Sequence, residues 1–364
     1  MTMRPSDEEL EALGLCHPSA PNAGEELRLL SGAFELGATV TEVTRAAEAR
    51  YNLGPLMLDL SLRPPGETKD LREFLQSEPE SELVRRIWSA LGLADTEEPT
   101  VRVTPDAADA LRLLVAMAAL LGEATALGVA RVIGASMVRL AETVSDAFRV
   151  TQEIPNLSTG QTRADVAEGY VSTVPLLLPP FIEAIGAVFR RHLVDVSYQT
   201  WSTDSDISAV TKDRTVCFAD LVGSTEALRD ISVRDMADKL RRFEELVWDV
   251  VGAGGGRVVK LIGDEAIFVI EDPAHACRAG LELIARSEHP VRVGMAYGTV
   301  LGLYGDYFGE TVNLAARLVN LADRSTLVVS ESVRNALGSD ITCESMGSHA
   351  LKGFADPVPV YRVA

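Results

Sequence analysis

Apolar residues in the first half of the chain recur every three or four positions. Two examples are the series Leu83, Ile87, Leu91 and the series Leu111, Leu114, Val115, Met117. This spacing places apolar side chains on one face of an α-helix. Breaks typical of helix boundaries separate the series, at Pro64-Pro65-Gly66 and at Thr104-Pro105-Asp106. The pattern therefore predicts an all-helical domain over residues 1–196.

The pattern changes after Val196. Residues 197–213 are polar and typical of a connector, and from Arg214 onward short β-rich runs alternate with amphipathic helices. The predicted strands are 215–218, 257–261, 266–270, 291–297, 327–330 and 358–363, and the predicted helices are 226–251, 272–287 and 311–322. This alternation indicates an α+β domain over residues 214–364, an α-β sandwich with one helical layer on a sheet.

Two apolar stretches, 111–136 and 171–189, require comparison with membrane-spanning helices. Glu123 and Arg131 interrupt the first stretch, and Pro175, Pro179-Pro180 and Glu183 interrupt the second. Neither therefore has the roughly 20 uninterrupted apolar residues that a bilayer requires. We predict that both form buried helices and that the chain has no transmembrane segment.

Charge and cysteine content limit which partners and which cellular compartment are compatible with the sequence. The chain has 364 residues, a formal net charge of −19 and 47% hydrophobic residues. Such a hydrophobic content excludes wholesale disorder, and the acidic field disfavours nucleic acid as a partner. The N-terminus lacks a basic-then-apolar secretion signal, and the four cysteines form no CxxC pair or metal-ligand spacing. These features predict a cytoplasmic protein.

Residues 34–57, two short periodic segments around Gly37, leave two interpretations open. They are compatible with a DNA-binding helix-turn-helix, but only Arg45 and Arg50 are available to contact phosphates. A helical pair that packs on a neighbouring element is the simpler interpretation.

Three segments of the second half carry candidate chemistry. In the first, residues 218–225, a predicted strand delivers Asp220 into a turn ahead of a helix. A carboxylate beside exposed backbone N–H groups is suited to a hard cation and a polyphosphate. Strand-end aspartates also cap the following helix, so this segment alone proves little.

The second segment, residues 260–265, places Lys260 and Asp264 on opposite arms of a tight hairpin. By itself it is equally compatible with a surface ion pair. In the third segment, residues 306–317, Asn313 and Arg317 are four positions apart and share one face of a predicted helix, with Asp306 on a Gly-rich turn before it. A salt-bridged Arg317 and a capping Asn313 would be the structural alternative.

Together, in this order and at these separations, the three segments resemble the catalytic domain of class III nucleotidyl cyclases over residues 211–364. The resemblance implies that Asp220 and Asp264 bind two divalent cations per site, Mg²⁺ or Mn²⁺. Lys260 and Asp306 would recognise the purine, Asn313 would orient the ribose and Arg317 would stabilise charge on the phosphates. Lys352 would bind the triphosphate.

The chemistry of cyclisation is consistent with that assignment. Two cations on shared carboxylates serve both the attacking 3′-hydroxyl and the leaving pyrophosphate. Adenine offers an acceptor at N1 and a donor at N6, which suit Lys260 and Asp306, whereas guanine inverts both edges. Two mismatches would disfavour GTP by about 10²- to 10⁴-fold. We therefore expect an adenylate cyclase that acts on ATP, with guanylate cyclase as the near alternative.

The same resemblance implies a homodimer with two symmetric sites. In each site Asp220 and Asp264 of one subunit would face Lys260, Asp306, Asn313 and Arg317 of the other. A non-catalytic nucleotide-sensing or DNA-binding regulator that uses the fold for dimerisation is the alternative from another class, and the intact set of polar residues disfavours it.

More loosely, the helical half resembles the regulatory domain of a subset of actinobacterial class III cyclases, where it inhibits or licenses catalysis. The resemblance implies that this domain can respond to pH, and a small molecule or a lipid is a further candidate signal. His192, next to the connector, is a candidate proton sensor or simply a solvated histidine near a helix end. The apolar helices within 111–129 and 176–189 would enclose a lipid, pack in a core or form a dimer interface.

Overall fold

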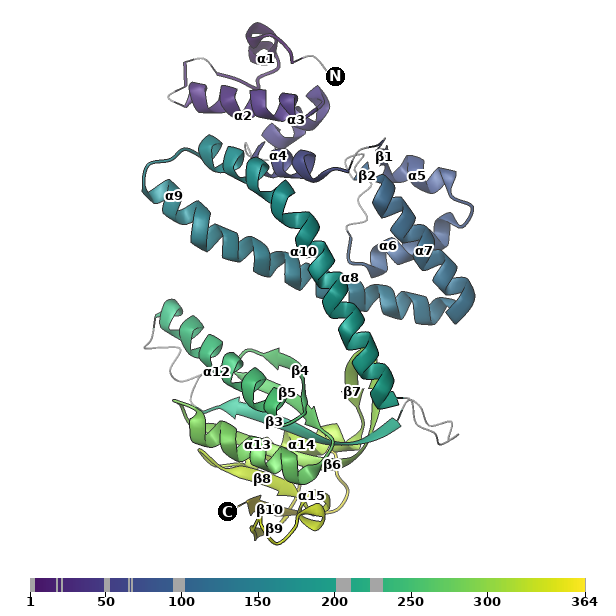
Figure 1. Cartoon of the computed structure of the whole chain (residues 1–364), viewed down its shortest axis with the longest axis vertical. Coiled ribbons are helices and arrows are strands. Elements are labelled where there is room, and N and C mark those ends of the chain that lie inside the picture. Colours follow the sequence, from purple (N-terminus) through teal and green to yellow (C-terminus); the bar gives the residue numbers. More distant parts are fainter. Residues whose placement is uncertain are drawn as a thin grey trace. The chain divides into compact units, whose positions relative to one another are not determined.

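The computed structural model describes residues 4–17, 19–20, 22–48, 53–64, 66, 68–93, 102–200, 211–222 and 232–363. The chain divides into two compact units, Met1–Trp201 and Ser202–Ala364. Figure 1 shows their helices and strands. The units are described separately below.

The N-terminal unit is built almost entirely from helices. They are α1 (Asp7–Ala12), α2 (Ala23–Glu35), α3 (Val40–Glu48), α4 (Leu53–Leu62), α5 (Leu71–Ser77), α6 (Ser81–Ala90), α7 (Pro105–Leu121), α8 (Glu123–Phe148), the π-helical turn η1 (Arg149–Glu153), α9 (Ile154–Ser158) and α10 (Arg163–Thr200). The strands β1 (Lys69–Asp70) and β2 (Arg102–Val103) form a two-residue antiparallel pair. The predicted helical class is confirmed, with this short pair as an addition.

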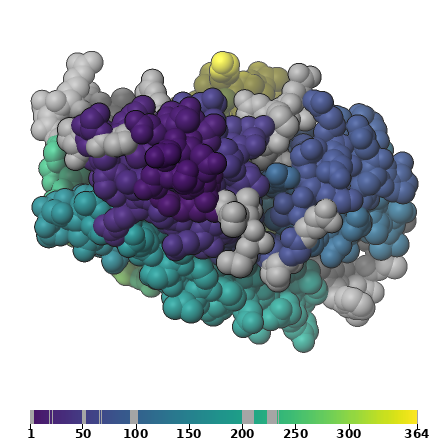
Figure 2. Space-filling model, turned by 90° about the horizontal axis from the view of Figure 1, so that it is seen from above, coloured from purple at the N-terminus to yellow at the C-terminus, as the bar shows by residue number. Residues whose placement is uncertain are grey.

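Two hydrophobic clusters stabilise the N-terminal unit. The first is centred on α1–α4 and buries Phe34, Val43 and Met57, and the second is centred on α5–α8 and buries Ile87 and Trp88. In Figure 2 their helices, purple and blue, cover separate areas of the surface. The described parts of 34–57 thus pack in a shared core, as expected for a helical pair, while Arg50 lies outside the described residues.

The prediction that both apolar stretches are buried is wrong for 171–189, in α10. It is only partly correct for 111–136, where Leu111, Leu114 and Leu127 are buried but Leu113 and Leu120 are exposed. The most apolar 18-residue window of Arg163–Tyr198 has no buried residue, and that of Glu123–Ser158 is 28% buried. Both helical stretches are long and apolar enough to cross a membrane by length and composition alone. The described part of the chain leaves apolar side chains such as Val138, Ile182 and Phe189 exposed.

The C-terminal unit alternates strands and helices. They are β3 (Thr211–Leu221), α12 (Val233–Ala253), β4 (Arg257–Ile262), β5 (Glu265–Ile270), α13 (Pro273–Arg286), β6 (Val291–Leu303), β7 (Asp306–Phe308), α14 (Glu310–Leu321), β8 (Leu327–Ser330), α15 (Glu331–Ala336), β9 (Cys343–His349) and β10 (Val358–Val363). The ends of the predicted connector, 197–200 and 211–213, belong to α10 and β3. Residues 201–210 lie outside the described residues.

The strands form one sheet in the order β4-β5-β3-β6-β8-β10-β9, with β7 paired to β6. Only β6 and β8 are parallel among the described pairs. Alternate residues of β3 face opposite sides, so Cys217 packs with α12 and α13 while Phe218 packs with α14. The α-β sandwich is confirmed, but helices cover both faces because α14 packs opposite α12 and α13.

A close approach between α14 and the sheet fixes the position of that helix. A Cβ atom on Gly294 of β6 would lie 2.1 Å from the backbone nitrogen of Val319 in α14. Only glycine permits this distance, so the helix lies directly against β6. This contact fixes the distance between the sheet and the residues on the outer side of α14.

Candidate active site

Two carboxylates meet where β3 ends. Asp220 is the penultimate residue of β3, and Asp264 lies in the turn between β4 and β5. The Leu221 backbone N–H donates a 3.2 Å hydrogen bond to the Asp264 carbonyl oxygen, which holds the turn against the strand end. Burial raises the pKa of Asp220, Arg292 lowers it and the Asp264 carboxyl raises it again, so the pKa stays above its ordinary value.

Arg292 is a site residue that sequence analysis missed. It is directly opposite Asp220 in the β3–β6 register. Its Nε donates a 2.6 Å hydrogen bond to Asp220 Oδ2, and its Nη2 lies 2.5 Å from the same oxygen. Only the long-range register brings together these two residues, which are 72 positions apart.

A third carboxylate, Glu265, is opposite Asp220 on the other neighbouring strand. Burial and the charges of Asp220 and Asp264 raise the pKa of Glu265. Oxygen donors of this kind suit Mg²⁺ or Mn²⁺, and a cation would relieve the repulsion between neighbouring carboxyl groups. Among the described residues no group of three His, Cys, Asp or Glu side chains is arranged to hold a metal. Asp220 and Asp264 are therefore candidate ligands, two carboxylates whose oxygens are of the kind that such a cation prefers.

An ammonium–carboxylate pair forms a second part of the site. Lys260 Nζ on β4 lies 2.5 Å from Asp306 Oδ2 on β7, although the residues are 46 positions apart. The Tyr307 backbone N–H also donates to Asp306 Oδ1, at 2.8 Å. Both side chains of the pair are about one-third exposed. The structure thus pairs Lys260 with Asp306 rather than placing it in a hairpin pair with Asp264.

The third part lies on α14. Asn313 is exposed and Arg317 is half-buried, one turn further along the helix. The Arg317 guanidinium donates from Nε to the Lys352 carbonyl oxygen at 3.4 Å. Lys352 itself is exposed, in the turn before Gly353. The helix cap is Gly309, so the capping alternative for Asn313 does not apply.

One chain therefore groups the predicted site residues into three sets. These are Asp220 with Asp264, Lys260 with Asp306, and Arg317 with the Lys352 backbone. Within the described part of the chain, no hydrogen bond or ion pair joins Asp220 to Asn313 or Arg317. Asp220 does not cap α12 either, because Ser232 does. Residues 223–225 of the first motif lie outside the described residues.

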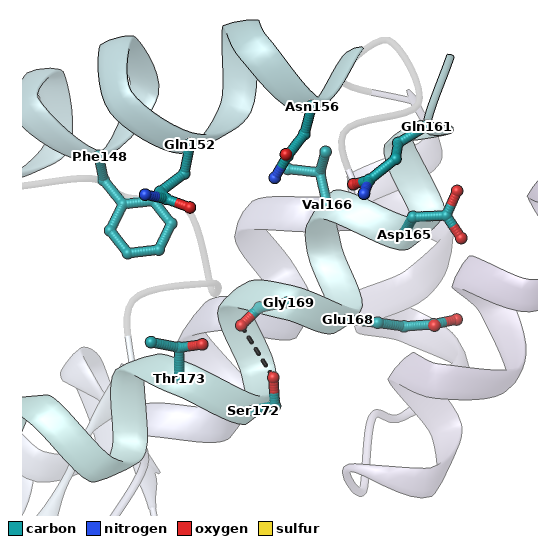
Figure 3. A pocket seen from close by; sticks show the side chains of 10 residues that line it. All are labelled: Phe148, Gln152, Asn156, Gln161, Asp165, Val166, Glu168, Gly169, Ser172 and Thr173. Atoms are coloured by element: carbon teal, nitrogen blue, oxygen red, sulfur yellow. Dashed lines mark hydrogen bonds between the residues drawn. The ribbon is translucent and has the colours of Figure 1, made fainter. Parts of the chain in front are cut away.

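The N-terminal unit has a cavity of about 650 Å³ between the η1–α9 segment and the start of α10. Figure 3 shows the amide side chains of Gln152 and Asn156 directed from η1 and α9 toward α10, with Gln161 at one end. None of the predicted site residues lines this cavity. His192 is exposed on α10, nearer its C-terminal end.

Comparisons with known proteins agree with the motif resemblance. Residues 208–363 match the family model "Adenylate and Guanylate cyclase catalytic domain". An uncharacterized protein of Mycobacterium tuberculosis is 36% identical over 97% of this chain and 93% of its own length. An adenylate cyclase of Streptomyces coelicolor is 35% identical over 78% of this chain and 76% of its own length. A pH-sensitive adenylate cyclase of M. tuberculosis is 29% identical over 78% of this chain and 74% of its own length.

Proposed function

This chain belongs to the class III nucleotidyl cyclase family, and we propose that it is an adenylate cyclase converting ATP to 3′,5′-cyclic AMP and pyrophosphate in the cytoplasm. The observation that carries the choice of substrate is the contact between Lys260 Nζ and Asp306 Oδ2. It places one donor and one acceptor side by side, both partly accessible. Adenine N1 accepts from the ammonium and the N6 amino group donates to the carboxylate, whereas guanine would leave both groups unpaired.

Asp220 and Asp264 are the proposed holders of the divalent cations, with Arg292 as the fixed positive charge beside them. When bound, the cations would favour a deprotonated 3′-hydroxyl and neutralise charge on the departing pyrophosphate. Helix α14 and the turn that contains Lys352 supply the remaining groups in the proposal. Asn313 orients the ribose, Arg317 stabilises the negative charge that develops on the phosphates, and Lys352 binds the triphosphate.

A homodimer is part of this proposal. Among the described residues no hydrogen bond or ion pair joins Asp220 to Asn313 or Arg317, so a second copy would complete the site. The exposed face of α10 supports such pairing, because Ile182, Phe189 and Val196 recur every seven residues and are 57%, 64% and 51% exposed. A seven-residue apolar repeat is typical of helices that pair along their length.

Co-expression of two inactive chains tests the shared site. We expect Asp220→Ala and Arg317→Ala each to abolish cyclisation, because each removes one half of both sites. In mixed dimers one of the two sites is intact, so random pairing restores about a quarter of wild-type activity. Absence of any recovery despite mixed dimers would contradict the shared site.

The substrate assignment is tested with the purified full chain, ATP or GTP, and Mn²⁺. We expect cyclic AMP from wild type, at least about 10²-fold less cyclic product from GTP, and none from Asp220→Ala. Asp340→Ala is the matched control, since Asp340 is an exposed carboxylate bonded to Arg278 at 2.8 Å. Cyclic product that persists in Asp220→Ala would refute the metal assignment, and equal use of GTP would refute the base assignment.

Control by the N-terminal domain, residues 1–196, is the last part of the proposal. The helix α10 ends at Thr200, and β3, the strand that carries Asp220, begins at Thr211. A displacement of about 1 Å between reacting groups can cost on the order of 10²-fold in rate, so small movements of α10 would suffice to change the activity.

A polar small molecule in the amide-lined cavity, or a proton, is a suitable signal for this control. Activity profiles from pH 5.5 to 8 for wild type and His192→Ala test the proton, and identical profiles would remove His192.

A further inference from the structure

We propose that Arg257 is a positioning residue that holds the β6–β7 hairpin and thereby sets the position of Asp306. Arg257 lies on β4, three residues before Lys260. The inference rests on the proposed function, because it assigns base selectivity to the Lys260–Asp306 pair. It concerns a residue that contacts neither the carboxylate cluster nor the α14 residues among the interactions described above.

A β-bulge places Arg257 and Lys260 on the same face of the sheet. Residues three apart on a regular strand face opposite sides. Here Arg257 is paired with Val269 and Lys260 with Ile267, so Val259 is an extra residue in β4. Val269 and Ile267 belong to the hydrophobic cluster on the α14 face. The bulge therefore turns both cations toward the hairpin that carries Asp306.

Arg257 contacts the hairpin on both sides of Asp306. Its Nη1 and Nη2 donate to the Gly305 carbonyl oxygen at 3.3 and 3.2 Å. Its Cζ lies 5.2 Å from the centroid of the Tyr307 ring, within the range of a cation–π contact. One guanidinium thus binds the residue before Asp306 and the residue after it.

The hairpin turn needs such a restraint because its backbone is strained. Leu303 is paired with Asp306, which leaves Tyr304 and Gly305 as the two turn residues. Their φ angles are +53° and +81°. Two positive φ values define a tight turn that glycine accepts and a bulky side chain such as tyrosine adopts rarely. The two Arg257 hydrogen bonds to the Gly305 carbonyl oxygen stabilise this turn relative to conformations with less backbone strain.

Loss of Arg257 would release the turn and shift the Asp306 carboxylate relative to Lys260. The shift would lower kcat/KM for ATP more than kcat/KM for GTP, because adenine uses both groups and guanine matches neither. We therefore expect Arg257→Met to lower kcat/KM for ATP about tenfold, mainly through KM, with GTP changed less than about twofold. Arg257→Lys keeps the charge and an N–H donor but loses the planar guanidinium fork, so it should restore part of the ATP preference.

The control is Arg362→Met, because Arg362 is another strand arginine with an exposed side chain, bonded to Glu344 away from the hairpin. It should leave the ATP-to-GTP ratio unchanged. Hydrogen exchange of the nucleotide-free full chain gives a second readout. Amides of residues 303–308 should exchange faster in Arg257→Met than in wild type, and those of α13 should not.

Each outcome decides the question. Unchanged exchange in the hairpin, or an unchanged ATP-to-GTP ratio of kcat/KM, would overturn the positioning role. Faster exchange together with a lowered ATP-to-GTP ratio would support it. A wild-type chain that makes no cyclic product would instead overturn the proposed function, and the exchange measurement would still decide whether Arg257 restrains the hairpin.

Discussion

Arg292 and Asp220 face each other across neighbouring strands, with Arg292 Nε 2.6 Å from Asp220 Oδ2. The arginine side chain is 32% exposed and the aspartate side chain 13% exposed. The guanidinium is therefore the counter-charge of a largely buried carboxylate that also has Asp264 nearby. A divalent cation bound at the same carboxylates would supply the same compensation.

We predict that Arg292→Met lowers the thermal stability of the metal-free protein, because a buried carboxylate loses its partner. Leaving such a group unpaired costs about 1–3 kcal/mol. Mn²⁺ should recover more of the melting temperature in the variant than it adds to wild type. The double variant Asp220→Asn/Arg292→Met removes both charges and should melt above Arg292→Met. No destabilisation in Arg292→Met would show that the pair contributes little.

A second prediction concerns the base. Exchanging the polarity of the pair, in Lys260→Glu/Asp306→Lys, keeps one cation and one anion but inverts donor and acceptor. The inverted pair matches guanine and mismatches adenine, so the kcat/KM ratio of ATP to GTP should fall by about 10²-fold or more. Each single change places two like charges together and should lower activity with both nucleotides. A double variant that keeps its ATP preference would contradict base recognition by this pair.

Elements with local signals were predictable from the sequence. Asp272 caps α13 through a hydrogen bond accepted from the His275 backbone N–H, and Pro105 begins α7. β8 has the predicted bounds because all four of its residues are buried and apolar or small. In contrast, β9 (Cys343–His349) has no apolar alternation and exists through its pairing with β10.

The remaining differences also depend on distant parts of the chain. α10 continues through Pro175 and the Pro179-Pro180 pair, so these prolines do not end the helix. Sequence motifs predicted Lys260 and Asp306 as site residues. Their contact depends on the bulge in β4, just as the position of Arg292 depends on the β3–β6 register.

A third prediction concerns acid stability of the N-terminal unit. The Thr162 backbone N–H and hydroxyl donate to Asp165 Oδ2 at 2.7 and 2.8 Å, and Arg28 donates to Oδ1 at 2.9 Å. These contacts, the Thr162 backbone bond above all, lower the pKa of Asp165 to about 2. A lowered folded-state pKa stabilises the fold above the unfolded-state value, and the stabilisation is lost as pH falls toward 2.

Asp165→Asn should therefore lower the melting temperature at pH 7, and the difference from wild type should be roughly halved at pH 3. Melting curves of both proteins from pH 7 to pH 3 provide the measurement. Asp109→Asn is the control, because Asp109 is a more exposed carboxylate bonded to Arg112 at 3.3 Å. A difference between wild type and Asp165→Asn that is independent of pH would contradict the assignment to ionisation.

The exposed apolar face of α10 gives the last prediction. A glutamate within a helix seam places like charges opposite each other in the two copies, so Phe189→Glu should weaken the dimer. Leu120→Glu on α7 is the control, because Leu120 is 81% exposed and lies outside the seven-residue repeat. Sedimentation should show Phe189→Glu as a monomer at concentrations where wild type is dimeric, and its cyclase activity should fall at least about tenfold. That activity should recover as protein concentration rises, because mass action restores dimers. A Phe189→Glu chain that remains dimeric, with wild type floating on lipid vesicles, would assign this face to a membrane surface instead.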